Sequence, residues 1–279
     1  MNSKYSHWIS VHPCFNSSAH FKFSRMHLPV AAKCNIQCNY CNPKKLNKCE
    51  FKPGYAEKLL TPLEAFKKVE DAIKVYPTLK VVGIAGPGDP LANKETFETF
   101  KLINESFPWL TKCLSTNGLL LPDKISKLVK LNIKTVTITI NTINPNIGSK
   151  IYSWINYNNK IYTGIEGSLI LIKNQLDGIE LASKNDLKVK VNSVLIPGIN
   201  DLELVNIAKE ASIRGAFLMN IIPLIPSYKF KNFRPPTCKE LNEARKECEA
   251  YLPQFRLCQQ CRADGVYEPC GNLIKYIKT

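Results

Sequence analysis

The sequence lacks the features that mark several classes of protein. No stretch approaches about 18 consecutive apolar residues, so no transmembrane helix and no membrane partner are expected. The segment from Met1 to Arg25 has no apolar core of the kind found in signal peptides, and a cytoplasmic location follows as the default. The chain contains no internal repeat, no low-complexity segment and no run of five lysines. Its positive charge is therefore not gathered into a basic tail, and no nucleic-acid partner is expected.

Positive charge and cysteine are present in excess. The formal net charge of +15 favours anionic partners, although the lysines are spread as on an ordinary solvated surface. The 11 cysteines are an odd number, so they cannot all pair within the chain. Because no export signal is present, metal ligation is a stronger interpretation than a disulfide framework.

A regular alternation of strand and helix patterns predicts an α/β fold. Several apolar runs are rich in Val and Ile, as in parallel strands covered on both faces. Thr61 begins a capping box, and Leu63, Phe66, Val69 and Ile73 share one face of the helix behind it. Six β-α units predict a partial barrel or an open doubly wound sheet, with ligands at the carboxyl ends of the strands. The expected strands are His27–Ala31, Lys80–Ala85, Lys112–Ser115, Lys134–Ile140, Lys188–Leu195 and Ala216–Pro223.

Three regions are expected along the chain. Residues 1–24 form an amino-terminal arm, residues 25–225 the β-α domain, and residues 226–279 a helix near Thr237–Tyr251 with a cysteine-rich tail. Further helices are expected at Lys94–Ser106, Asp123–Leu131, Glu166–Asn185 and Asp201–Arg214, with Asp201 as an N-cap.

A cysteine motif follows the first expected strand. Cys34, Cys38 and Cys41 have the spacing C-x3-C-x2-C. Three thiolates this close on a loop can hold three irons of a [4Fe–4S] cube and leave the fourth iron without a cysteine. Zinc is the alternative, but structural zinc sites take four protein ligands, commonly from paired C-x2-C knuckles. The trio therefore favours an iron–sulfur cluster.

On this motif the chain resembles the radical S-adenosylmethionine (SAM) superfamily. The resemblance implies a partial (β/α)6 barrel of the TIM type. It also implies that the open iron binds the amino and carboxylate groups of SAM, and that one electron cleaves SAM into methionine and a 5′-deoxyadenosyl radical.

Polar and glycine residues after the later strands provide candidate SAM-binding groups. The turn with Gly86, Gly88 and Asp89 lets the backbone approach a ligand, although such turns are often structural only. It lies where the superfamily binds the SAM amino group. The remaining candidates are Ser115 and Asn117 after the third strand, Asn141 after the fourth, and Asn192 and Ser193 in the fifth.

Seven ordered segments resemble one family within this superfamily, the NifB proteins of nitrogenase cofactor biosynthesis. They begin with Arg25-Met-His27-Leu-Pro-Val-Ala and end with Cys258-Gln-Gln-Cys261-Arg-Ala-Asp264. The resemblance implies that two [4Fe–4S] clusters, K1 and K2, are fused into an [8Fe–9S–C] cluster, with a carbide from SAM and an added sulfide. The separate cofactor-carrying domain of the family does not occur in this sequence, so a stand-alone core form is expected.

The resemblance also implies ligands for the two substrate clusters. K1 is assigned to His27, Cys113 and Cys49, and K2 to Cys258, Cys261 and Cys270. Catalytic roles are implied for Cys113 and for Glu50 near the reacting SAM. Alternatives remain for each, since a lone strand histidine is often a core residue, the tail could bind zinc, and Glu50 could be an ordinary surface residue.

The chain departs from the family pattern at two positions. Cys49 stands further from the trio than the family cysteine, and Met219 replaces a common histidine. Cys238 and Cys248 are expected to be buried thiols. Cys14 lies near His7, His12 and His20, a grouping that could bind metal, although a disordered or capping arm is the favoured interpretation. Arg25 and Arg262 are candidates to stabilise anionic clusters.

Three functions were weighed. The first is a NifB-type enzyme, whose partners would be an Fe–S cluster donor, a cofactor acceptor and an electron donor such as ferredoxin or flavodoxin. The second is a radical SAM enzyme with permanent auxiliary clusters that acts on a peptide or small molecule. The third, a zinc or nucleic-acid-binding module, explains neither the trio nor the β-α units.

Overall fold

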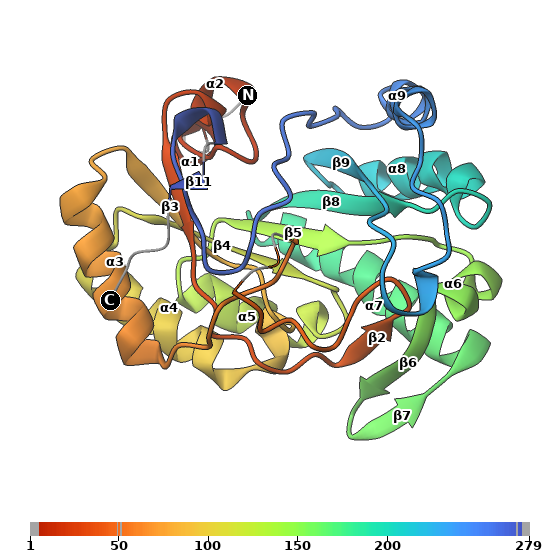
Figure 1. Cartoon of the computed structure of the whole chain (residues 1–279), viewed down its shortest axis with the longest axis horizontal. Helices are drawn as coiled ribbons and strands as arrows, with labels where there is room; N and C mark the ends of the chain where they lie inside the picture. The colour runs from red at the N-terminus through yellow and green to blue at the C-terminus, as the bar shows by residue number, and fades with distance from the viewer. Residues whose placement is uncertain (1–5, 49, 51, 272, 275–279) are drawn as a thin grey trace.

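A curved parallel sheet forms the framework of the molecule. The computed structural model describes residues 6–48, 50, 52–271 and 273–274. In this part of the chain six neighbouring strands run parallel in the order β1-β3-β4-β5-β8-β9, which confirms the expected partial barrel (Figure 1). These strands are β1 (Ser24–His27), β3 (Leu79–Ile84), β4 (Thr111–Thr116), β5 (Thr135–Thr139), β8 (Lys188–Leu195) and β9 (Leu218–Pro223).

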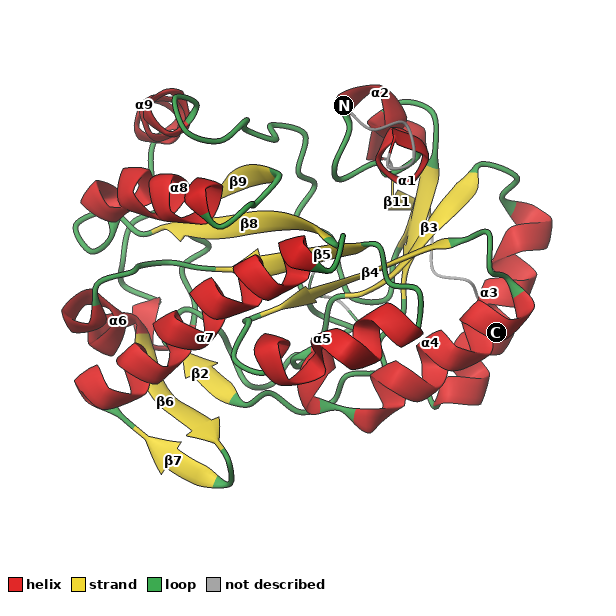
Figure 2. Ribbon diagram, turned by 180° about the vertical axis from the view of Figure 1, so that it is seen from behind, coloured by secondary structure: helices red, strands yellow, loops and turns green. Residues whose placement is uncertain are grey.

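Helices cover the outer face of the sheet. Figure 2, which shows the molecule from behind, has α3, α4, α5, α7 and α8 side by side in front of the strands. Their inward side chains and the outer faces of the strands form the main apolar core. The bounds are α3 (Pro62–Val75), α4 (Lys94–Ser106), α5 (Leu121–Lys130), α7 (Gly164–Lys184) and α8 (Leu204–Ile213).

The capping box at Thr61 is confirmed. The Thr61 hydroxyl accepts a hydrogen bond from the backbone nitrogen of Glu64, and the Glu64 carboxylate accepts one from the Thr61 backbone nitrogen at 2.7 Å. The predicted face of α3 was wrong at Leu63, which is 56% exposed. The other predicted residues do face the core, since Val69 is buried with Ala65 and Ala72, and Phe66 and Ile73 pack against the core while partly buried.

Two other expected boundaries were wrong. The first strand ends at His27 instead of continuing to Ala31, because Pro29 has no N–H to donate and Val30 closes a turn onto the Leu28 carbonyl at 3.0 Å. Asp201 is not the N-cap of α8. It begins a short 3-10 helix, η3 (Asp201–Glu203), and its carboxylate accepts a hydrogen bond from Gly198 at 3.2 Å.

A second, three-stranded sheet was missed by the sequence patterns. Its antiparallel strands are β2 (Ile36–Cys38), β6 (Tyr152–Tyr157) and β7 (Lys160–Tyr162), in that order. A short helix, α6 (Pro145–Ile151), precedes β6. Strand β2 lies inside the cysteine motif, and it pairs with a strand that follows more than a hundred residues later. Because β2 has three residues, no periodicity identifies it.

The described part of the amino-terminal arm, residues 6–24, packs onto the domain. It carries the short helices α1 (Ser6–Ser10) and α2 (Ser17–His20). Phe15 packs with Leu218 of β9 and Phe255 of the tail in a small apolar cluster, against which Cys14 and Cys258 also pack. Residues 6–24 therefore cap the domain. The predicted region boundaries after residues 24 and 225 stay a prediction.

The carboxyl-terminal tail closes the open side of the half-barrel. Its first anchor is on β9, where Pro253 accepts a hydrogen bond from Met219 at 2.9 Å and Phe255 donates one to Met219 at 2.7 Å. Its second anchor is β10 (Val266–Tyr267), which pairs antiparallel with β1 and carries β11 (Leu273–Ile274) at the edge. The segment between the anchors crosses the mouth of the barrel (Figure 1).

The tail is preceded by the short turn η4 (Tyr228–Phe230) and by α9 (Cys238–Cys248), which is capped by Thr237. Cys248 is buried as expected, whereas Cys238 lies exposed at the first turn of α9, so that prediction was wrong. The remaining short turns are η2 (Pro90–Ala92) and η5 (Pro269–Gly271).

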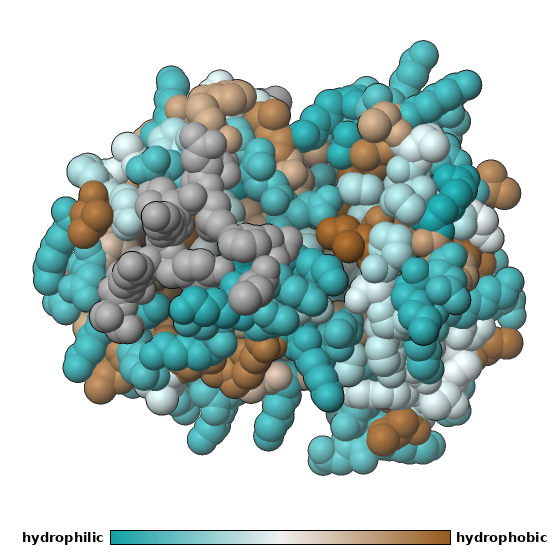
Figure 3. Space-filling model, viewed as in Figure 1, coloured by the Kyte–Doolittle hydropathy of each residue, from teal (hydrophilic) through white to brown (hydrophobic). Residues whose placement is uncertain are grey.

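The surface carries the excess charge in a dispersed way. Figure 3 shows hydrophilic side chains over most of the visible face, with apolar residues scattered among them. In the part of the chain that the structure describes, no helix is long and apolar enough to cross a membrane.

Replacing Gly88 by Ala tests the close packing of the turn after β3. A Cβ on Gly88 would collide with the carbonyl group of Lys33 and lie 2.9 Å from its nitrogen. We expect Gly88→Ala to lower the free energy of unfolding by about 2 kcal/mol or more, as overpacking against backbone does. Urea unfolding of the metal-free chain measures this. The control is Gly164→Ala, where φ is +59° and no atom lies within 4 Å, so only about 1 kcal/mol of backbone strain is expected. Equal losses in both variants would contradict the steric explanation.

Candidate iron–sulfur active site

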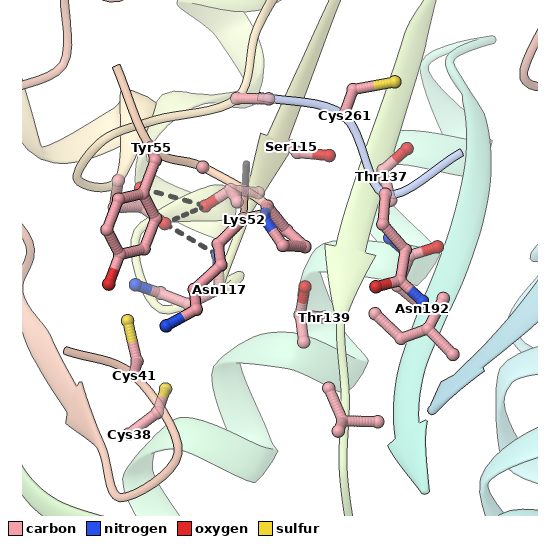
Figure 4. A pocket seen from close by; sticks show the side chains of 18 of the residues that line it. Cys38, Cys41, Lys52, Tyr55, Ser115, Asn117, Thr137, Thr139, Asn192 and Cys261 are labelled. Atoms are coloured by element: carbon pink, nitrogen blue, oxygen red, sulfur yellow. Dashed lines mark hydrogen bonds between the residues drawn. The ribbon is translucent and has the colours of Figure 1, made fainter. Parts of the chain in front are cut away.

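A single pocket at the carboxyl ends of the strands collects most of the thiols. Its volume is about 350 Å³. The trio loop lines one end of it, and the tail lines the other, with strand residues between them (Figure 4). Among the described residues its wall contains two histidines, His12 and His27, and seven cysteines: Cys14, Cys34, Cys38, Cys41, Cys113, Cys258 and Cys261.

The trio loop is shaped by local hydrogen bonds. Strand β2 ends at Cys38, where its register with β6 shifts. The Gln37 side chain donates to the carbonyls of Cys38 at 2.8 Å and Cys41 at 2.7 Å, and Cys41 donates its backbone N–H back to Cys38 at 3.1 Å. Figure 4 shows the Cys38 and Cys41 sulfurs side by side. All three thiols of the trio therefore reach the same end of the pocket, as a cubane with one open iron requires.

The surroundings of the trio keep Cys34 and Cys38 as protonated thiols in the metal-free chain. Burial raises the pKa of the Cys34 thiol to about 11 and that of Cys38 well above its usual value, and the neighbouring thiols add to both shifts. Although burial opposes the charge of Lys45, Cys41 and Cys34 raise the pKa of this ammonium group. A metal-free site therefore holds neutral thiols beside a lysine cation, and binding a thiolate-ligated cluster releases protons.

Asp89 joins the turn after β3 to the end of β4. Its buried carboxylate accepts hydrogen bonds from Leu91 N at 2.9 Å, from the Thr116 hydroxyl at 2.8 Å and from Asn117 N at 2.6 Å. Burial raises the pKa of this carboxyl group, and these hydrogen bonds act in the opposite direction. Asn117 in turn donates to Asn35 Oδ1 at 2.7 Å, next to the trio. Asp89 thus positions Asn117 against the cluster loop, and Gly88 and Asp89 both line the pocket.

The other predicted SAM-binding residues divide into two groups. Ser115 and Asn192 line the pocket, together with Thr137 and Thr139, and Figure 4 shows these side chains between the two sulfur-rich ends. The pocket lining does not include Gly86, Asn141 and Ser193. The buried Asn141 amide donates to the Tyr40 hydroxyl at 2.9 Å, and the Ser193 hydroxyl donates to the Ile140 carbonyl at 2.5 Å. Their direct contact with SAM stays a prediction.

His27 and Cys113 meet beside Gly83. A Cβ added to Gly83 would lie 2.8 Å from the Cys113 sulfur and 3.6 Å from His27 Nε2, so both groups flank the same point. His27 Nδ1 lies 2.9 Å from the Arg262 carbonyl oxygen. Because a carbonyl oxygen only accepts, Nδ1 carries the proton and Nε2 has a free lone pair. A metal-binding histidine commonly has this outer hydrogen bond to a backbone carbonyl.

The opposite end of the pocket combines the tail with the amino-terminal arm. Cys258 and Cys261 come from the tail and Cys14 from the arm. Arg25 is 2% exposed and donates through Nη2 to the Cys261 sulfur at 3.1 Å. Although burial disfavours its charge, Cys14 and Cys261 raise the pKa of Arg25. The two sulfurs and the guanidinium group therefore form one compact cluster.

Cys270 is not brought to this cluster. It lies exposed in η5, which follows β10. Because β10 runs antiparallel to β1 and Tyr267 pairs with Arg25, the residues after β10 lie toward the amino end of β1. That end is opposite the pocket, and the α2 helix packs there. The described structure therefore does not join Cys270 to Cys258 and Cys261, because the pairing of β10 with β1 takes it away.

The loop after the trio is held by Arg262. The Arg262 side chain, 3% exposed, pairs with the Asp264 carboxylate through two bonds of 2.9 Å and also donates to the carbonyls of Asn47 and Glu50. Arg262 therefore supports this loop instead of facing the pocket. The Glu50 carboxylate pairs with Lys52 at 3.2 Å, and only Lys52 of these two lines the pocket. The predicted ligand Cys49 lies outside the described residues.

The sequence predicted no site role for several residues of the pocket wall, Lys45 and Lys190 among them, and favoured a capping arm over a metal site for His12 and Cys14. The arm carried a weak signal, since His12 and Cys14 are two residues apart and both are metal-binding types. Lys190 could not be found, because strand alternation does not reveal that β8 directs a lysine inward. Met219 packs in the core and does not line the pocket.

The fold and the three-cysteine loop define a radical SAM protein, and the family model of the Radical SAM superfamily matches residues 28–211. A crystal structure of a radical SAM methyltransferase from Sphaerobacter thermophilus has a similar fold, with a TM-score of 0.56 and 20% identity. The similarity covers 90% of this chain and 69% of that one.

More specific relatives place the chain in one family. The FeMo cofactor biosynthesis protein NifB of Methanocaldococcus jannaschii is 54% identical over 266 residues, which cover 95% of this chain and 88% of that protein. NifB of Bradyrhizobium diazoefficiens is 47% identical over 92% of this chain, which spans about half (53%) of that longer relative. The chain belongs to the NifB family within the radical SAM superfamily. The family implies a [4Fe–4S] cluster and SAM as cofactors.

Acidification tests whether the pocket histidines are neutral in the folded chain. Burial lowers the pKa of His27 to about 4 and that of His12 well below its usual value. Below pH about 6.5 these two imidazoles become protonated in the unfolded chain but stay neutral in the folded chain. The free energy of unfolding therefore falls as the pH drops toward about 4. We expect the urea midpoint of the metal-free chain to be lower at pH 5.5 than at pH 7.5, with a smaller difference in His12→Gln. An unchanged difference in that variant would contradict a neutral, buried His12.

Proposed function

We propose that this chain is a radical SAM enzyme that fuses two [4Fe–4S] clusters, K1 and K2, into an [8Fe–9S–C] precursor of the nitrogenase cofactor, with the carbide carbon taken from the methyl group of SAM and the ninth sulfur added as sulfide. One observation carries the proposal. Two further sets of sulfur and nitrogen ligands, from different parts of the chain, face the same pocket as the trio. Adjacent substrate clusters at one site are what a fusion reaction needs.

The trio is the site for the resident cofactor. Cys34, Cys38 and Cys41 would hold the [4Fe–4S] cluster, and SAM would bind at its open iron. When bound, these groups supply a methyl group and a 5′-deoxyadenosyl radical. The hydroxyl and amide groups of Ser115, Asn117, Thr137, Thr139 and Asn192 line the space between the trio and the far end of the pocket, where they can hold the SAM carboxylate, ribose and adenine.

His27 and Cys113 are two ligands for K1. His27 Nε2 has a free lone pair because Nδ1 donates to the Arg262 carbonyl. The His27 ring and the Cys113 sulfur both lie beside Gly83. Burial raises the pKa of Cys113 to about 12, so the thiol becomes a thiolate when iron replaces its proton. Cys49 is our proposed third ligand from sequence, with Glu50 as the acidic residue nearby. We also keep the catalytic role that the sequence predicted for Cys113.

Cys258, Cys261 and Cys14 are the ligand set that we propose for K2. Cys14 replaces the predicted Cys270, since Cys14 and Cys258 pack against one apolar cluster and Cys14 and Cys261 both surround Arg25. The Arg25 guanidinium group offsets the negative charge that a thiolate-ligated cluster brings into this buried position. Three protein ligands leave one iron of the cluster open for fusion.

The partners follow from the reaction. An Fe–S cluster donor must deliver K1 and K2, an electron donor such as ferredoxin or flavodoxin must reduce the trio cluster, and an acceptor must take the product. We propose a cytoplasmic setting for this exchange, where a reduced cluster donor is available. No nucleic-acid or membrane partner is required.

Counting iron tests the number of clusters. After anaerobic reconstitution we expect about 12 irons per chain for three cubanes. A Cys258→Ala/Cys261→Ala variant should lose about 4 irons, and Cys14→Ala should lose the same cluster. Iron and acid-labile sulfide analysis measure this.

Cys248→Ala is the matched control, because Cys248 is buried in the core away from the pocket. It should keep all three clusters. A wild-type value near 4 irons, with no loss in the tail variant, would contradict the K1 and K2 sites.

A turnover experiment separates fusion from electron transfer. With SAM, a reductant and a source of sulfide, the loaded wild-type chain should convert K1 and K2 into one extractable eight-iron cluster. In His27→Ala, which lacks a K1 ligand, no eight-iron cluster should form. If the clusters remain separate cubanes after SAM cleavage in the wild type, they are permanent auxiliary clusters that serve another substrate.

A further inference from the structure

His12 lies deep in the wall of the pocket, beside the proposed K2 ligands. It is 1% exposed, and its ring packs against the Phe15 ring at 4.7 Å between centroids. Its Nδ1 accepts a hydrogen bond from the backbone nitrogen of Cys14 at 3.1 Å. A backbone amide nitrogen can only donate, so Nδ1 carries the lone pair and Nε2 carries the proton in the neutral ring.

The two pocket histidines therefore have opposite tautomers. His27 donates from Nδ1 and presents a lone pair at Nε2, whereas His12 accepts at Nδ1 and presents an N–H at Nε2. A lone pair can bind iron, but an N–H cannot. His12 is thus suited to donate a hydrogen bond and unsuited to ligate a metal through Nε2.

His12 Nε2 has no hydrogen-bond partner among the described residues. A buried donor without an acceptor costs about 1–3 kcal/mol, so native structures rarely leave one. This N–H is therefore available to an acceptor that binds in the pocket.

The surroundings of His12 indicate that the missing acceptor is anionic. Arg25, 2% exposed, has unpartnered Nε and Nη1 atoms in the described structure and bonds to Cys261 through Nη2. Lys190 donates to the Cys14 carbonyl at 3.2 Å, and its ammonium group lies 5.2 Å from the Phe15 ring centroid. Together, the Arg25 and Lys190 cations and the His12 N–H attract an anion. They repel a bare metal ion whose charge is not offset by thiolate ligands.

We propose that His12 donates a hydrogen bond from Nε2 to a sulfur atom, thiolate or sulfide, of the cluster held by Cys14, Cys258 and Cys261, and that it is not an iron ligand. This inference rests on the proposed K2 site. Hydrogen bonds to cluster sulfurs stabilise the reduced, more negative state, so they raise the reduction potential. His12 is a positioning residue that sets the potential and orientation of K2.

Reduction potentials test the role directly. The reconstituted wild-type chain is titrated anaerobically and followed by electron paramagnetic resonance, and the K2 signal is identified as the one missing from Cys258→Ala/Cys261→Ala. In His12→Phe this signal should move to a more negative potential with iron content unchanged. In His12→Gln, whose side-chain amide keeps an N–H at a similar reach, the potential should return toward the wild-type value.

His20→Phe is the matched control. His20 is 2% exposed and lies on the same arm, but it does not line the pocket. Its replacement should leave the K2 potential unchanged, so a shift common to both variants would reflect a disturbed arm and overturn the proposal.

The remaining outcomes separate this inference from the K2 site. If Cys14→Ala and the tail variant lose no iron, the K2 site itself is wrong. If iron is bound but His12→Phe leaves the potential unchanged, only the role of His12 is wrong. Loss of K2 iron in both His12→Phe and His12→Gln would make His12 a ligand and overturn the proposal. Loss in His12→Phe alone, with a wild-type potential in His12→Gln, would support the hydrogen bond.

Discussion

The active site depends on one structural constraint, the crossing of the barrel mouth by the tail. A half-barrel leaves one side open between β9 and β1, and the tail bridges these two strands by backbone pairing at residues 253–255 and 266–267. Between the anchors the backbone also bonds to the trio side of the molecule, since Gly54 donates to the Cys261 carbonyl at 3.2 Å and Ala263 donates to the Tyr55 carbonyl at 2.8 Å. Cys258 and Cys261 are therefore held opposite the trio by a strap that is fixed at both ends.

The metal-free pocket already contains buried positive charge that an anionic cluster can neutralise. Arg25 and Lys190 are 2% and 5% exposed, and burial keeps the pKa of the nearby Cys261 thiol raised to about 11 although Arg25 lowers it. A metal-free pocket therefore has cations facing neutral thiols. Buried charges without compensation are unfavourable. An anionic, thiolate-ligated cluster would supply that compensation, and this explains why polar donors such as Arg25 Nε and His12 Nε2 lack partners within the described protein.

The sequence predicted the framework well because its signals are local. The alternation of apolar strands and amphipathic helices indicated the partial barrel, and the capping box located the start of α3 within one residue. The prediction failed where pairing is long-range. Strand β2 has three residues and depends on β6, and the first strand was placed too late because Pro29 was read within an apolar run. At the site, Ser115, Asn117 and Asn192 line the pocket, whereas Asn141 and Ser193 bond to the structure around it.

By itself the sequence determined the trio of Cys34, Cys38 and Cys41, because three ligands on one short loop need no distant partner to be recognised. It also determined the β-α order of the barrel. Only the tertiary structure decided which of the remaining thiols share a site. The pairing of β10 with β1 takes Cys270 to the far end, while the packing of Phe15 on Phe255 brings Cys14 to the tail. The tautomers of His12 and His27 were likewise decided by the backbone groups of Cys14 and Arg262, which contact the rings only after folding.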